Sequence, residues 1–96
     1  MKLSKTTISY ANKRGLDVYI DEGTRLLWIA SSNEDIGEDI CCYTVNENGT
    51  FSYHGNVWLP QATKEELPAT IWNERKLREV IDFISKDEDV KRESGL

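Results

Sequence analysis

The residues best suited to chemistry are one histidine, His54, and two neighbouring cysteines, Cys41 and Cys42. A cysteine becomes nucleophilic when a nearby base stabilises its thiolate, so the catalytic arrangement open to these residues is a Cys–His pair. Consecutive strand residues point to opposite faces, which predicts one cysteine in the core and the other only incidentally exposed. No pattern indicates an oxyanion hole or a third, orienting group. We therefore expect no catalytic residues, and a small Cys/His enzyme is the least favoured alternative.

Metal and phosphate sites are not predicted either. One histidine beside two adjacent cysteines does not supply the spaced ligand pairs of structural zinc. The acidic segment 33–39 resembles a calcium loop superficially, but Gly37 is misplaced and Thr44 stands where an EF-hand has its bidentate glutamate. Glycine-rich phosphate loops and Gly-x-Ser-x-Gly elbows are absent from the sequence. We expect no metal and no cofactor.

Length and composition indicate a single folded domain. The chain has 96 residues, 39% of them hydrophobic and 30% charged, a balance that supports a packed core rather than disorder. We expect the domain to cover residues 1–86 and a charged tail to cover 87–96. The longest apolar run, 26–30, is far shorter than the roughly 20 residues of a membrane span. With no signal-peptide core and no useful disulfide, we expect a cytoplasmic protein with reduced thiols and no membrane partner.

The net charge of −5 is unevenly distributed along the chain. Residues 16–49 hold eight acids and a single base, Arg25. Such a stretch repels phosphate and suits a basic protein surface, so direct nucleic-acid binding is not favoured. The alternative is a small regulator that touches nucleic acid through the bases of its N-terminal segment: Lys2, Lys5, Lys13 and Arg14.

The residue patterns in the first two thirds of the chain predict one helix followed by several strands. Ser4 is a suitable N-cap and Gly15 a suitable helix end, which favours a helix over a strand with a turn at 12–15. Alternating polarity and turn signals then predict four strands, at 16–21, 25–31, 39–45 and 50–58. Gly23 is expected to supply a positive φ in the first turn. Two consecutive hairpins predict an antiparallel sheet.

The last third predicts a second long helix. Aliphatic residues recur at helical spacing over 74–86, and Asn73 is placed to cap the start: Leu77, Val80, Ile81 and Ile84. Before it, the capping-box pattern at 63–66 predicts at most one short turn, halted near Pro68. The expected fold is therefore α+β: a small four-stranded antiparallel sheet with the C-terminal helix and an N-terminal helix packed on one face.

Two aromatic residues are candidate binding anchors. By period 2, Trp58 shares a face with three polar residues of the fourth strand: Ser52, His54 and Asn56. It is either covered by the following loop or used as an exposed anchor, since aromatics are favoured in protein interfaces. Tyr19, flanked by Asp17 and Asp21, has the same ambiguity, whereas Trp28 is expected in the core.

These patterns predict a non-catalytic, acidic protein-binding module that occludes or adapts a partner with a basic surface. Small acidic inhibitors of nucleic-acid-handling proteins, of the kind encoded by phages or plasmids, are one such class. The predicted partner-binding residues are acids of the central stretch together with the two aromatic candidates: Asp17, Tyr19, Asp21, Glu22, Glu34, Asp35, Glu38, Asp39 and Trp58.

Overall fold

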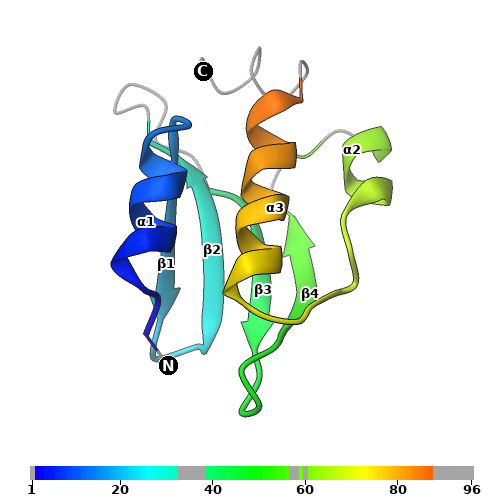
Figure 1. Ribbon diagram of the computed structural model, residues 1–96. Coiled ribbons are helices and arrows are strands. Elements are labelled where there is room, and N and C mark those ends of the chain that lie inside the picture. The colour runs from blue at the N-terminus through cyan, green and yellow to red at the C-terminus, as the bar shows by residue number, and fades with distance from the viewer. Residues whose placement is uncertain (1, 33–38, 57–58, 60, 88–96) are drawn as a thin grey trace.

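The computed structural model describes residues 2–32, 39–56, 59 and 61–87, and it confirms an α+β fold with an antiparallel sheet and helices at both ends (Figure 1). Neighbouring strands are consecutive in the chain, in the order β1-β2-β3-β4-β5. The elements in chain order are α1 (Lys5–Asn12), β1 (Leu16–Asp21), β2 (Leu26–Ser31), β3 (Asp39–Val45), β4 (Phe51–Asn56), α2 (Gln61–Glu66), β5 (Thr70–Ile71) and α3 (Glu74–Lys86).

The sheet has five strands, so the expectation of four was wrong. The additional strand, β5, pairs with β4 through Phe51 and Ile71. The hydroxyl of Tyr43 fixes the approach to β5 by donating a hydrogen bond of 2.9 Å to the carbonyl of Pro68. A two-residue strand is too short to show a period-2 pattern, and it forms because distant residues hold it against the sheet.

The sequence located the caps of both long helices. The hydroxyl of Ser4 accepts a hydrogen bond of 3.3 Å from the amide of Thr7, which confirms α1 as a helix. Gly15, with φ of 79°, follows α1 in the left-handed region that glycine tolerates. At α3, the side chain of Asn73 accepts from the amide of Lys76 at 2.9 Å.

The core lies between the sheet and the two long helices. Figure 1 shows α1 and α3 side by side on one face of the sheet. Burial of each large aliphatic side chain contributes about 1.5–3 kcal/mol, so the helical stripe of α3 is a main source of stability. Several side chains from both layers have no exposed surface: Leu16, Leu27, Ile29, Phe51, Leu77, Ile81 and Ile84.

Polar contacts join α1 to α3 near both ends of α1. The carboxylate of Glu74 accepts hydrogen bonds from the Ser4 amide at 3.0 Å, the Ser4 hydroxyl at 2.8 Å and the Thr7 hydroxyl at 2.7 Å. Towards the other end, the Nε atom of Arg14 lies 3.1 Å from Oδ1 of Asp82. Because start meets start and end meets end, the two helices run in the same direction.

The turn between β1 and β2 has its left-handed residue in an unexpected place. Arg25 has φ of 57°, whereas Gly23 is not among the residues with positive φ, so the expectation for Gly23 was wrong. The carboxylate of Asp21 accepts from the Gly23 amide at 3.0 Å, and the Asp21 carbonyl accepts from the Arg25 amide at 2.8 Å. These bonds fix a four-residue loop in which the last residue, Arg25, adopts the left-handed conformation that was expected of Gly23.

The segment from α2 to the end of α3 completes the fold. α2 is a helix of six residues where one short turn was expected. Its Thr63 hydroxyl donates a hydrogen bond of 2.7 Å to Asp87, the residue that follows α3. The rest of the expected tail, 88–96, lies outside the described residues. None of the helices in the described ranges is both long and apolar enough to cross a membrane.

Candidate protein-binding face of the sheet

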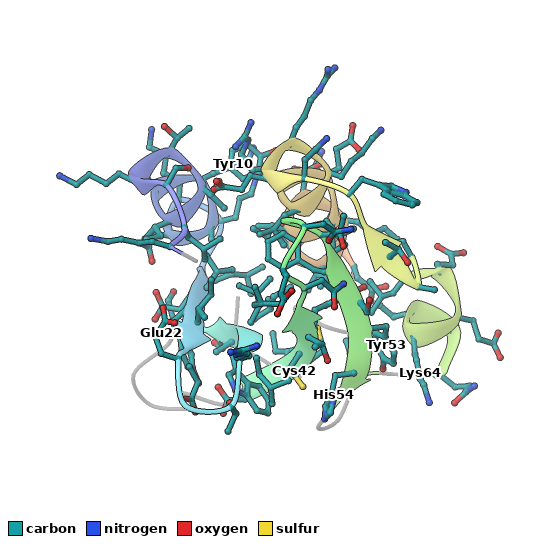
Figure 2. The ribbon with its side chains drawn as sticks, turned by 90° about the horizontal axis from the view of Figure 1, so that it is seen from below. Tyr10, Glu22, Cys42, Tyr53, His54 and Lys64 are labelled. Atoms are coloured by element: carbon teal, nitrogen blue, oxygen red, sulfur yellow. The ribbon has the colours of Figure 1, made fainter. Side chains whose placement is uncertain are left out.

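The face of the sheet opposite α1 and α3, here called the open face, consists of the β1–β4 side chains that point away from those helices. Figure 2 shows the two helices on one side of the sheet and the side chains of Cys42 and His54 on the other. In β1, Leu16 and Val18 are buried towards the helices, and Asp17, Tyr19 and Asp21 alternate with them and are exposed.

A hydrogen bond on this face links β1 and β3, the two strands on either side of β2. The hydroxyl of Tyr19 in β1 donates to Oδ1 of Asp39 in β3 at 2.7 Å. Along the sheet, Tyr19 pairs with Trp28, while Asp17 and Asp39 both pair with Ala30. The small side chain of Ala30 therefore occupies the position between the two acids and leaves room for the tyrosine ring to span β2.

The electrostatics at Tyr19 reflect the acids around it. The pKa of Tyr19 is raised to about 12. Partial burial is the largest cause, and the hydrogen bond to Asp39 and the negative charge of Asp39 come next. The charges of Asp21 and Asp17 make smaller contributions in the same direction. The phenol is therefore neutral and able to donate a hydrogen bond over the whole physiological range. The same three carboxylates that oppose its ionisation create a negative field at the surface.

Four of the predicted binding residues come together on the open face: Asp17, Tyr19, Asp21 and Asp39. Glu22 lies in the following turn and is exposed. It lines a shallow cleft at that end of the sheet with Arg25 and Glu47. The remaining predicted residues lie outside the described part of the chain: Glu34, Asp35, Glu38 and Trp58.

An irregularity in β4 removes the basis on which Trp58 was assigned to the polar face. Cys42 pairs with Gly55 while Tyr43 pairs with Tyr53, so β4 contains one extra residue at this point. Such a β-bulge shifts the alternation of side chains by one. The alternation on which the prediction for Trp58 rests is therefore interrupted at His54, and Trp58 itself lies outside the described residues.

Trp28 lies on the open face, so the expectation that it belongs to the core was wrong. It is half-buried and alternates with the fully buried Leu27 and Ile29, whose side chains face the helices. Because β2 is apolar on both faces, its hydropathy did not show which residues point to the open face. No local pattern could have placed it, because its face follows from the register with β1, in which Trp28 pairs with Tyr19.

The cysteines are buried rather than paired with the histidine. Cys41 has no exposed surface and Cys42 only 4%, so the expectation that one of them is exposed was wrong. Cys42 lies in the central strand and pairs with Trp28, whose large side chain shares its face of the sheet. Burial raises the pKa of Cys41 to about 12, and burial also raises the pKa of Cys42. His54 is exposed, with Nδ1 3.4 Å from the hydroxyl of Thr44.

The basic N-terminal segment is partly engaged within the fold. The guanidinium of Arg14 lies 3.5 Å from the centre of the Tyr10 ring and also contacts Asp82, so its charge is compensated. Lys2, Lys5 and Lys13 remain exposed. Within the described ranges, no three His, Cys, Asp or Glu side chains are grouped so that they could hold a metal ion.

Comparison of the chain with protein-family models, curated proteins and solved structures gave no significant match. No function is therefore transferred from a relative. The chemistry of the open face itself is the basis for assigning one.

Proposed function

We propose that this protein is a non-catalytic binding module whose open face engages a basic surface of another protein. The observation that carries the proposal is the grouping of Asp17, Tyr19, Asp21 and Asp39 on the sheet face opposite the helices. Carboxylates accelerate encounter with a cationic patch. Exposed ion pairs contribute only about 0–1 kcal/mol each, so a tyrosine in their midst is needed to retain the partner.

The class of partner follows from the sign of the field. A surface that binds nucleic acid is rich in lysine and arginine, because it must neutralise phosphates. An acidic face that covers such a surface would occlude it, and we propose a nucleic-acid-handling protein as the target. The free, buried cysteines are compatible with the reducing conditions of the cytoplasm.

The test begins with affinity capture from the cells that produce the protein, with the wild-type chain as bait. We expect a basic protein to be captured by the wild type and lost with Asp17→Lys/Asp21→Lys. The matched control, Glu65→Lys/Glu79→Lys, makes the same change in net charge at exposed acids of α2 and α3, which lie off the open face. It should capture the partner as the wild type does at physiological salt.

Rate measurements with the purified partner then separate steering from anchoring. Asp17→Lys/Asp21→Lys should slow association by about tenfold at low salt and by less at high salt. Tyr19→Ala should instead accelerate dissociation. If both variants bound like the wild type while Lys2, Lys5 and Lys13 substitutions abolished binding, the acidic face would not be the site.

A further inference from the structure

The outer edge of β5 presents backbone groups that the sheet does not use. The amide of Tyr53 in β4 donates to the carbonyl of Ala69 at 2.8 Å, and Phe51 pairs with Ile71. In antiparallel strands, residue pairs that exchange hydrogen bonds alternate with pairs that do not. The backbone groups of Ala69 and Ile71 therefore point towards β4. Thr70, between them, directs its N–H and C=O away from β4. Among the described residues, these two groups have no hydrogen-bond partner.

An apolar groove of about 360 Å³ lies beside this edge, between β5 and α3. It is lined by the almost fully buried Ile71 and Val80 and by the partly buried Phe83. Trp72, which also lines the groove, is 68% exposed, the highest value among the large hydrophobic side chains described. An exposed indole beside an apolar groove is typical of a binding surface, since tryptophan is enriched among interface anchors.

The charges at the rim of the groove set a preference for the occupant. The Nζ atom of Lys76 lies 3.2 Å from Oε2 of Glu79, so these two charges largely compensate each other. Glu66, at the end of α2, is exposed and leaves the rim with a net negative charge. A cationic residue is therefore favoured next to Glu66.

We propose that the edge of β5 and the adjoining groove bind an extended peptide segment of another protein by strand addition. The segment forms a sixth strand of the sheet, and its backbone makes hydrogen bonds with the N–H and C=O of Thr70. Alternate apolar side chains enter the groove beside Trp72 and Phe83, and a lysine or arginine faces Glu66. Backbone bonds supply affinity and the groove supplies selectivity, as in other complexes formed by strand addition.

A second copy of the chain is a poorer occupant than a basic, apolar peptide. Each copy carries a net charge of −5, so self-association brings like charges together, including the two Glu66 carboxylates. This surface is separate from the open face, and its role does not depend on the function proposed for that face.

The test uses a phage-displayed library of short random peptides, panned against the full chain. Affinities of synthetic copies of the enriched peptides are measured by fluorescence anisotropy. Thr70→Pro removes the outward N–H, and a proline is tolerated there because that N–H is not used within the sheet. Thr70→Ala is the reference for Thr70→Pro, because both variants lose the threonine side chain that lines the groove and only Thr70→Ala keeps the N–H. Trp72→Ala removes the exposed indole and does not disturb the core.

We expect enriched peptides with apolar residues at alternate positions and a lysine or arginine. Thr70→Pro and Trp72→Ala should each weaken binding by about tenfold or more. The open-face variant Asp17→Lys should bind within about twofold of wild type, which separates this surface from the open face. Thr70→Ala should bind about tenfold or more tightly than Thr70→Pro, because only the proline variant lacks the outward N–H. If Thr70→Pro lowers the melting temperature, a loss of binding could result from a disturbed fold. The affinity of Trp72→Ala then decides whether the groove binds the peptide. Failure to enrich such peptides, or equal affinity for wild type and Trp72→Ala, would overturn the proposal. So would wild-type dimerisation that Trp72→Ala abolishes, because the occupant would then be a second copy.

Discussion

The hydroxyl of Thr7 in α1 donates a hydrogen bond of 2.7 Å to the carboxylate of Glu74 in α3, although the two residues are 67 positions apart in the sequence. Partial burial disfavours the charged carboxylate, but the hydrogen bonds from Thr7 and Ser4 and the charge of Arg78 outweigh this effect. The pKa of Glu74 is therefore below its ordinary value of 4.5. This contact fixes the start of one helix against the start of the other.

Glu74→Gln should lower the free energy of unfolding by about 1–2 kcal/mol near pH 7, because it removes the charge that these donors stabilise. A lowered carboxyl pKa stabilises the fold above pH 4.5, and this contribution is lost as the pH falls through the lower pKa of the folded state. Urea unfolding at neutral and acidic pH measures both effects.

The control for Glu74 is Glu79→Gln on the same helix, where the carboxylate is exposed and lies 3.2 Å from the Nζ atom of Lys76. It should cost less than about 0.5 kcal/mol. An equal loss for Glu74→Gln and Glu79→Gln would mean that the contact between the helices contributes little.

Asp39→Asn should lower the pKa of Tyr19 from about 12 towards its ordinary value of 10.0, but only in part, since partial burial is the largest cause of the shift. In the wild type, the raised pKa stabilises the fold below pH 10, and this contribution is lost as the pH rises towards 12. NMR titration of the Tyr19 ring measures the change. Glu22→Gln, in the adjacent turn, should leave the titration unaltered; a similar shift in both variants would argue against a specific role of Asp39.

Leu77→Asp and Ile81→Asp should each destabilise the protein by several kcal/mol, about 3–5, or prevent folding. Both side chains are fully buried between α3 and the sheet, where an unpaired carboxylate has no compensating partner. Thermal unfolding followed by circular dichroism is the measurement. Arg75→Asp, at an exposed position of the same helix, should leave the melting temperature nearly unchanged. An unchanged melting temperature for Leu77→Asp would exclude this packing of α3.

Arg25→Gly should be neutral or stabilise the protein by up to about 1 kcal/mol, because φ of 57° is unfavourable for a residue with a Cβ atom. Thr24→Gly, one position earlier and without a positive φ, should instead destabilise by about 0.5–1 kcal/mol through the added entropy of the unfolded chain. Denaturant midpoints of the two variants give the comparison. A lower midpoint for Arg25→Gly than for Thr24→Gly would show that the arginine side chain stabilises the turn.

The sequence alone determined the elements whose formation depends on neighbours in the chain. The stripe of Leu77 and Ile81 predicted α3, and Ser4 and Asn73 marked the starts of both long helices, because caps and helical faces are local features. The alternation in β1 likewise placed Asp17, Tyr19 and Asp21 on one face. These predictions required only the 3.6- and 2-residue periods of helix and strand.

The tertiary structure decided what depends on residues far apart in the chain. β5 exists because Phe51 and Tyr43 hold a segment that has no strand pattern of its own, and the bulge in β4 arises from its register with β3. The pairing of β2 with its two neighbours places Trp28 on the open face. The same pairing allows the Tyr19 hydroxyl to reach Asp39 over Ala30. Strand pairing is a long-range choice of hydrogen-bond register, and a shift of one residue exchanges the two faces of a strand.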